Sequence, residues 1–428
     1  MENKYFRTVA ARVIAVVLDY GCRARYQIEV RGLEDCTHSP STLVVYNHRR
    51  DADTPIIGNI LFARRGLLEQ KYVPTFIARE DLFKRGFFAD YLEDWPAPIA
   101  RLLSPISVRP ALWALRAYPM RRIAERTLGE VLADVMDVFG DLPLHEVLRP
   151  RWVGEFARLA RLNGRPLRLS HVLRPQFRPL LRQGYGLTKL NHKCFRAFKP
   201  YERKTIESQM RVFVETLENG GSVQMAPEGA VSKDGHFARV RAGLHILINR
   251  PRTLVRVLPV GMAYDFMTSG RQRLFVNLGQ EMLDLRGLKP SVTSAKVAEA
   301  ILAQTTITGS QLASKLLAAA RTSRGATVTK TELDEYVAVE ASRWAGRGLY
   351  VDPRLLSRKD RRVRLAEYVE YCLRSGELVA LGGERYWVPP SKDEILPSWA
   401  HPAGAIDYLN NELASLSHVL LGTQEGAI

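Results

Sequence analysis

The chain has 428 residues, of which 46% are hydrophobic and 25% charged, and its 62 Lys and Arg outnumber its 45 Asp and Glu to give a net charge of +17. This composition is that of a globular protein, and it excludes a disordered or fibrous chain. The length favours one large domain with a smaller one. The positive surplus favours a polyanionic partner, whether nucleic acid, anionic lipid headgroups or an acidic carrier protein.

The cysteines indicate the compartment. Cys22, Cys36, Cys194 and Cys372 show no paired spacing, which argues against a disulfide framework or a zinc site and fits a reducing cytoplasm. No apolar run approaches the roughly 20 residues that cross a bilayer. The charged N-terminus is also unlike a signal peptide.

The first predicted element is a basic amphipathic helix over residues 1–24. Apolar residues that include Val13 and Val17 recur at helical spacing, and Arg12 lies elsewhere on the helical wheel. Such a helix either lies in a membrane interface or packs on the core. Of these two, we expect that the helix packs on the core.

Strands and helices then alternate. Apolar patterns predict strands over residues 26–30, 43–46, 73–78, 222–225, 253–260 and 274–278. A helix is predicted near 55–63, and several short, Arg-rich helices over 83–219, the last ending at Gly220-Gly221. This alternation predicts an α/β architecture.

The pattern changes beyond about residue 292. Short helices are predicted over 294–304, 309–320 and 329–341, and a hairpin follows around Gly382-Gly383. We therefore predict a mainly helical C-terminal domain over 292–428 with a winged-helix-like character.

One motif carries candidate chemistry. The stretch 47–53, Asn-His-Arg-Arg-Asp-Ala-Asp, follows the apolar run 43–46, and Asp53-Thr54-Pro55 is typical of a helix start. His48 would lie in the loop and Asp53 at the helix N-terminus, where the two can approach each other. A carboxylate that orients an imidazole makes a general base for a hydroxyl proton.

Two further motifs follow strands. Pro227-Glu228-Gly229 comes after the strand at 222–225, where glycine lets the backbone approach a ligand and glutamate can orient a polar group. Leu258-Pro259-Val260 is an apolar strand with a proline, which predicts a sheet end or edge at Pro259.

In this order, the motifs resemble those of the glycerolipid acyltransferase family, which contains glycerol-3-phosphate and 1-acylglycerol-3-phosphate acyltransferases. The first motif, N-H-x-x-x-x-D, matches in full, and Leu258-Pro259-Val260 matches the fourth. The third, commonly F-P-E-G-T-R-S, keeps Pro-Glu-Gly and Ser232 but loses its Phe, Thr and Arg. Arg241-Ala242-Gly243 is similar to the family's Lys/Arg-x-Gly element. The resemblance covers about residues 25–280.

The second motif of that family ends in an arginine that contacts the acceptor's phosphate. Arg121 is the first candidate here, and Arg196 is the alternative. Choosing Arg121 implies a helical insertion at about 125–205 within an acyltransferase domain over 25–290. The resemblance implies a mixed sheet flanked by helices for this domain.

The resemblance also implies a mechanism. Asp53 orients His48, which takes a proton from an acceptor hydroxyl that attacks an acyl thioester, without an acyl-enzyme. The co-substrate is acyl-CoA or acyl carrier protein, and neither a metal nor another cofactor is expected. Glu228 and Gly229 would shape the acceptor site, with Pro227 and Pro259 beside them.

The predicted function is transfer of a fatty acyl group to a lysophosphatidate-like acceptor in phospholipid synthesis, by a peripheral enzyme on the cytoplasmic face of the membrane. The net charge of +17 suits anionic headgroups and an acidic carrier. Glycerol 3-phosphate or another lipid hydroxyl or amine is the alternative acceptor. A different class of function is a nucleic-acid-binding regulator that uses the winged-helix-like C-terminus, for which duplex binding would fall steeply with salt.

Overall fold

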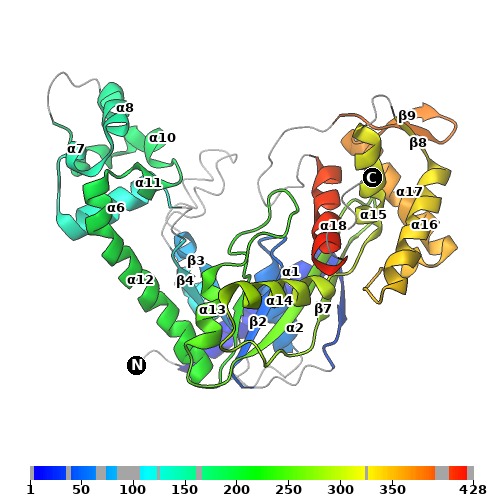
Figure 1. The fold of residues 1–428 in the computed structure, drawn as a ribbon, viewed down its shortest axis with the longest axis horizontal. Helices are drawn as coiled ribbons and strands as arrows, with labels where there is room; N and C mark the ends of the chain where they lie inside the picture. The colour runs from blue at the N-terminus through cyan, green and yellow to red at the C-terminus, as the bar shows by residue number, and fades with distance from the viewer. Residues whose placement is uncertain are drawn as a thin grey trace. The chain divides into compact units, whose positions relative to one another are not determined.

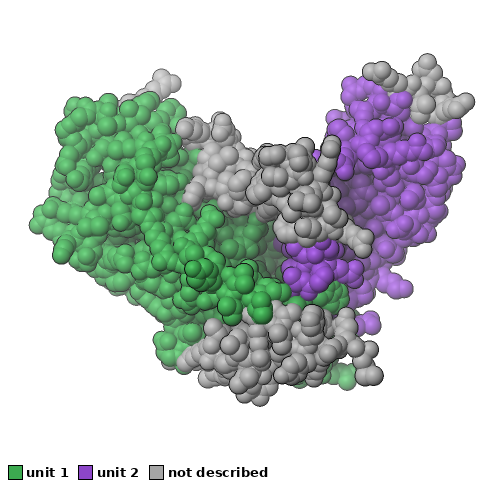
Figure 2. Space-filling view, turned by 180° about the vertical axis from the view of Figure 1, so that it is seen from behind, with its two compact units in different colours: residues 1–77, 113–117, 213–428 green, residues 78–112, 118–212 purple. Residues whose placement is uncertain are grey.

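The computed structural model describes residues 4–34, 40–63, 74–83, 107–122, 126–160, 166–322, 326–390 and 404–421. Contacts among these residues divide the chain into two compact units, shown in Figure 2. Unit 1 contains residues 1–77, 113–117 and 213–428, and unit 2 contains residues 78–112 and 118–212. The predicted boundary near residue 290 therefore lies inside unit 1.

Within the described residues, seven strands form one sheet in the order β1-β7-β6-β2-β5-β3-β4. They are β1 (Tyr26–Arg31), β2 (Thr42–Tyr46), β3 (Thr75–Arg79), β4 (Ala117–Met120), β5 (Val223–Met225), β6 (Arg256–Asp265) and β7 (Gln272–Leu278). The β6–β7 pair is antiparallel, whereas β1–β7, β2–β6, β2–β5 and β3–β5 are parallel. The predicted fold class, a mixed sheet flanked by helices, is confirmed.

Helices cover both faces of the sheet (Figure 1). They include α1 (Lys4–Arg25), α2 (Asp53–Ala63), α13 (Ala242–Asn249) and α14 (Pro290–Ala303). The β2-to-β3 connection through α2 and the β5-to-β6 connection through α13 run in opposite directions across the sheet. Because such crossovers are right-handed, α2 and α13 lie on opposite faces. The helix α1 packs against α2, and α14 packs against α13.

The burial of the central strand β2 accounts for its apolar sequence. Every residue of β2 is buried, because helices cover both faces at this point of the sheet. A strand that is buried on both faces reads as a continuous apolar run rather than an alternating one. This is why Leu43-Val44-Val45-Tyr46 predicts the strand correctly.

The C-terminal part of unit 1 is helical with a small sheet. Its helices are α15 (Gly309–Thr322), α16 (Lys330–Gly346), η5 (Pro353–Leu355), α17 (Arg358–Ser375) and α18 (Ala405–Leu421). In the described part of this region, β8 (Thr327–Thr329), β10 (Arg385–Trp387) and β9 (Val379–Gly382) form a sheet in that order. The predicted hairpin is confirmed as β9–β10, whereas β8 and α17 were not predicted.

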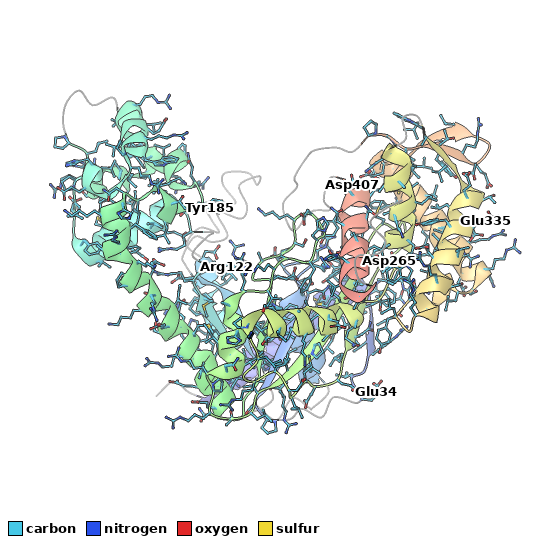
Figure 3. The ribbon with its side chains drawn as sticks, in the orientation of Figure 1. Glu34, Arg122, Tyr185, Asp265, Glu335 and Asp407 are labelled. Carbon is cyan, nitrogen blue, oxygen red and sulfur yellow. The ribbon has the colours of Figure 1, made fainter. Side chains whose placement is uncertain are left out.

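An ion pair attaches α17 to the large sheet. The Nε atom of Arg364 lies 2.6 Å from Oδ2 of Asp265 at the end of β6, and Asp265 is labelled in Figure 3. Both side chains are buried. Arg361 and Arg364, in the charge-rich first half of α17, are buried in ion pairs. Because charged residues occupy these buried positions, the helix lacks the apolar periodicity from which a helix is predicted.

Unit 2 has its own hydrophobic core, formed by residues between Leu128 and Phe198. The chain over 78–218 forms η2 (Glu80–Phe83), α5 (Arg109–Ala114), α6 (Leu128–Phe139), α7 (Leu144–Val147), α8 (Pro150–Ala160), α9 (Leu169–Val172), η4 (Pro175–Phe177), α10 (Arg178–Leu181), α11 (Gly186–Lys189) and α12 (His192–Glu218). The helical prediction for 83–219 is confirmed where this region is described, except at β4. That strand is four residues long and contains a proline, so its sequence signal is weak.

The strand predicted over 253–260 is displaced in the structure. It begins at Arg256 and continues to Asp265. The prediction of a sheet end or edge at Pro259 is wrong, because Pro259 lies inside β6, and β6 lies between β2 and β7. The β6–β7 ladder stops at the pair Val260–Leu278, and Pro259 lies just outside that pair. The N–H that Pro259 lacks therefore removes no hydrogen bond from the ladder.

The N-terminal helix exposes part of its apolar stripe. Val13 and Val17 are 58% and 64% exposed, and Val16 and Tyr20 beside them are also exposed. The expectation that the predicted stripe packs on the core is therefore wrong for Val13 and Val17, while Ile14 and Leu18 are half-buried. The side chains of residues 4–12 lie outside the described ones. Of the helices in the described ranges, none combines the length and hydropathy needed to span a bilayer.

Candidate active site

The first and third motifs lie side by side at the carboxyl ends of two neighbouring strands of the sheet. His48 follows β2 and Glu228 follows β5, and these neighbouring strands are parallel, with Val45 in register with Met225. Their connections leave toward opposite faces of the sheet. In α/β proteins, ligands bind outside the carboxyl ends of strands at such a position.

His48 and Asp53 are in contact. Nδ1 of His48 lies 3.1 Å from Oδ2 of Asp53, whose side chain is fully buried. The same oxygen accepts hydrogen bonds from the amides of Arg49 at 2.6 Å and Arg50 at 2.8 Å. The loop therefore folds around the carboxylate, which fixes the imidazole from the Nδ1 side. The catalytic role of the pair stays a prediction.

Tyr264 completes the surroundings of Asp53. Its hydroxyl donates to Oδ1 of Asp53 at 2.5 Å. Burial raises the pKa of Tyr264 well above its ordinary value, and Asp53 adds to this effect. The phenol therefore stays protonated and can donate. The guanidinium of Arg50 lies 5.8 Å from the Tyr264 ring centroid and 4.9 Å from that of Phe266, within cation–π range.

Sequence reasoning missed Tyr264. Tyr264 and Asp53 are 211 positions apart, and a tyrosine in an apolar strand has no motif spacing to mark it. The one available signal was its polar hydroxyl within the strand that carries Leu258-Pro259-Val260.

Asn47 anchors the loop to β6. Its Nδ2 donates to the Met262 carbonyl at 2.8 Å, and its Oδ1 accepts from the Met262 amide at 2.7 Å. A primary amide offers a donor and an acceptor side by side. The side chain of Asn47 therefore takes the place of the backbone groups that would pair with Met262 just beyond the end of β2. This position requires a primary amide because both hydrogen bonds are made at once.

Glu228 joins two loops. Its Oε1 accepts from the His48 amide at 2.8 Å, and its Oε2 accepts from the Ala238 amide at 2.7 Å. Burial raises the pKa of Glu228, while Arg49 and these two amides act in the opposite direction. Because backbone amides engage both oxygens, the contacts present assign Glu228 to loop positioning. Its predicted role toward the acceptor stays a prediction.

Gly229 and Arg241 lie against each other. Gly229 has φ +78°, and a Cβ there would lie 3.1 Å from Cγ of Arg241, so the site favours glycine both for its conformation and for its space. Arg241 is exposed, and its Nε donates to the Glu228 carbonyl at 3.2 Å. The Arg241 amide donates to the Pro227 carbonyl at 2.8 Å. Arg241 is thus a cation adjacent to Glu228 within unit 1.

Pro259 lies within the sheet, in register with Val45. Its carbonyl accepts a hydrogen bond from the Gly279 amide at 2.8 Å. These contacts give Pro259 a place in the sheet, and its role in substrate binding stays a prediction.

Arg121 and Arg196 belong to unit 2. The guanidinium of Arg121 is paired with Glu80 at 2.9 Å, Asp134 at 2.7 Å and Glu202 at 3.2 Å. Burial opposes its charge, but the carboxylates outweigh burial and raise the pKa of Arg121. A phosphate would have to compete with these carboxylates. Arg196 is exposed on α12, and a phosphate role for either arginine stays a prediction.

No three His, Cys, Asp or Glu side chains of the described ranges gather as a metal site requires. No protein-family model matches the sequence, and neither does any curated protein. The structure is similar to the crystal structure of the 1-acyl-sn-glycerophosphate acyltransferase PlsC from Thermotoga maritima, at 15% identity and a TM-score of 0.35, over 70% of this chain and 80% of that chain. We draw no function from a likeness of this size.

Proposed function

We propose that this protein is an acyltransferase that moves a fatty acyl group from a thioester to the hydroxyl of a lysophosphatidate-like acceptor, with His48 as the general base. The observation that carries the proposal is the 3.1 Å contact between His48 and the buried carboxylate of Asp53. Its position beyond the carboxyl ends of β2 and β5 is where an α/β sheet binds ligands. The motif resemblance adds the reaction type.

The chemistry follows from the surroundings of Asp53. The groups around its carboxylate donate to it, so Nδ1 of His48 carries the ring proton and Nε2 offers its lone pair. The acceptor hydroxyl gives its proton to Nε2 as its oxygen forms a bond to the thioester carbon. The tetrahedral intermediate then breaks its C–S bond, and the proton on Nε2 passes to the thiolate. The imidazole returns to its starting state.

Anion recognition in unit 1 would fall to Arg241. It is exposed and bonded to the carbonyl of Glu228, whose side chain contacts the His48 amide. A guanidinium suits a phosphate because it offers two parallel donors. We include Arg241 beside Arg121 and Arg196 as a candidate for the phosphate of the acceptor or donor.

Membrane contact would use α1. Its exposed stripe of Val13, Val16, Val17 and Tyr20 is apolar, and Arg23 and Arg25 occupy its last turn. An apolar face bordered by arginines is typical of a helix that lies in an anionic membrane surface. Attachment on the cytoplasmic face would place the enzyme beside its lipid substrates.

A panel of substrates tests this function. The purified full chain is incubated with labelled acyl-CoA or acyl carrier protein thioester and one of three acceptors: lysophosphatidate, glycerol 3-phosphate or a monoacylglycerol that lacks phosphate. We expect labelled phosphatidate from lysophosphatidate. Product only from glycerol 3-phosphate or from the monoacylglycerol would move the function to the alternative acceptors. Absence of labelled product in every arm would refute acyl transfer.

A further inference from the structure

Arg49, a loop residue without a predicted task, connects the His48–Asp53 pair to the C-terminal helix. Its amide donates to Oδ2 of Asp53 at 2.6 Å. Its guanidinium donates from Nη1 to the Gly235 carbonyl at 2.8 Å, and its Nε lies 3.3 Å from Oε1 of Glu412 on α18. Glu412 and Arg49 are 5% and 3% exposed, so this pair is held away from water.

The charge of Arg49 depends on its partners. Burial disfavours the cation, but Glu412 and further neighbours outweigh burial and raise the pKa of Arg49. Arginine stays charged in proteins, so removing the carboxylate leaves a buried cation without its counter-ion. The other oxygen of Glu412 accepts from Nε2 of Gln311 on α15 at 2.9 Å. Glu412 is therefore fixed from both sides.

The same helix holds the loop that follows the third motif. Nδ2 of Asn411 donates to the Asp234 carbonyl at 2.9 Å, and Oγ of Ser415 accepts from the Phe237 amide at 3.0 Å. Gly235 has φ +90°, and a Cβ there would lie 2.0 Å from the Tyr408 carbonyl oxygen. Residues 234–237 thus lie directly on α18, whose first turn carries Asp407 (Figure 3).

That loop in turn contacts His48. The Ser232 amide donates to the His48 carbonyl at 3.0 Å, and the Ala238 amide donates to Glu228, which accepts from the His48 amide. The contacts therefore run without a break from α18 through residues 232–238 to both backbone groups of His48.

We propose that α18 positions the active site: Glu412 holds Arg49, and through it the loops that carry His48 and Glu228, in the reactive arrangement. Arg49 and Glu412 are positioning residues and do not touch the reacting atoms. This inference rests on the proposed acyltransferase function, but its structural half can be measured without any activity.

Amide hydrogen exchange of the full chain gives the measurement that is independent of activity. In Glu412→Ala, we expect peptides over 232–238 to exchange at least about tenfold faster than in the parent, because local opening of the loop becomes easier. Peptides over β2 and β6 should exchange at the parent rate. The matched control is Glu340→Ala, which removes a buried carboxylate that pairs α16 with Lys315 on α15. Equal exchange at 232–238 in both variants would overturn the proposal.

Kinetics then separate positioning from stability. A misplacement of reacting groups by about 1 Å can cost on the order of a hundredfold in rate, so we expect kcat of Glu412→Ala to fall by roughly tenfold to a hundredfold. Its KM should change less than its kcat, since Glu412 itself contacts none of the predicted substrate-binding residues. Glu412→Asp keeps the carboxylate and should recover part of kcat, whereas Glu340→Ala should retain the parent kcat.

A double variant removes the orphaned charge. Replacing a buried ion pair with apolar residues of similar volume often leaves stability unchanged, so Arg49→Met with Glu412→Met should restore the thermal midpoint. Its kcat should stay low, because the Gly235 carbonyl has lost its donor. Recovery of kcat together with stability would mean that the pair is merely structural. If the parent chain transfers no acyl group, the proposed function fails, and hydrogen exchange alone decides the role of α18.

Discussion

At the scale of single residues, the carboxylate of Asp53 organises the candidate site. It accepts from the amides of Arg49 and Arg50 and from the hydroxyl of Tyr264, and it contacts His48. Each of these groups donates, so the carboxylate is held in one place. A general base that is already oriented loses little entropy when the acceptor binds. The precision of the site thus comes from Asp53 and the donors around it.

Tyr264→Phe tests this arrangement. The substitution removes the hydroxyl that donates to Asp53 at 2.5 Å and keeps the ring beside Arg50. We expect the free energy of unfolding to fall by about 1–3 kcal/mol, since a charged acceptor loses a buried donor. Activity should fall several-fold. Urea unfolding and acyl-transfer rates provide the measurements.

Tyr350→Phe is the matched control, because Tyr350 is 36% exposed. It should change neither stability nor rate. The view of Asp53 as the organising group would be wrong if the two phenylalanine variants behaved alike.

At the scale of elements, the loops after β2 and β5 act together. The His48 amide bonds to Glu228, and the Ser232 amide bonds to the His48 carbonyl. The conformation of one loop therefore depends on the other. Residues 234–237 also lie against α18, and their backbone must turn through Gly235 at φ +90°.

Gly235→Ala tests this close packing. A Cβ at Gly235 would meet the Tyr408 carbonyl oxygen at 2.0 Å, whereas a Cβ at Gly287, which has φ +79°, would meet nothing within 4 Å. Gly287→Ala therefore measures the conformational cost alone, about 1–2 kcal/mol. We expect Gly235→Ala to cost well over this, about 3–5 kcal/mol in all. Equal losses in chemical unfolding would show that α18 does not confine the loop.

The sequence predicts the local parts of this site and misses the distant ones. His48 and Asp53 could be paired because a strand, a short loop and a helix cap fix their separation within six residues. The partners Tyr264 and Glu412 come from other elements, whose packing no spacing encodes. The antiparallel β6–β7 pair and α17 were likewise not predicted, since strand direction and buried ion pairs are decided by tertiary contacts.

At the scale of the whole molecule, the proposed membrane contact depends on the exposed apolar face of α1. The net charge of +17 suits any polyanionic partner, and the observation specific to a membrane is the stripe of valines and a tyrosine that α1 exposes. The alternative predicted from the C-terminal helices and hairpin is duplex nucleic acid. Both partners would respond to salt, so only a direct comparison separates them.

Val16→Asp with Val17→Asp tests the membrane contact. These valines are 57% and 64% exposed, so their replacement should leave the fold intact. We expect co-sedimentation with vesicles that contain phosphatidylglycerol to fall at least about tenfold, because charged side chains oppose insertion of an apolar face.

Val339→Asp on α16 is the control, since Val339 is 65% exposed. It should bind vesicles as the parent does. Unchanged sedimentation of the α1 variant, or tight binding of the parent to duplex DNA but not to vesicles, would contradict membrane attachment through α1.

The acyl-transfer rate of His48→Gln tests most directly whether His48 is the general base. Glutamine keeps a polar side chain and the backbone amide that bonds to Glu228, so hydrogen exchange at β2 and β5 should match that of the parent. It supplies no base for the acceptor hydroxyl, and general-base catalysis is worth about 10²–10⁴-fold. We predict that kcat/KM with lysophosphatidate and acyl-CoA falls by at least about a hundredfold in a folded variant. A folded His48→Gln variant with parental kcat/KM would contradict the assignment of His48 as the base.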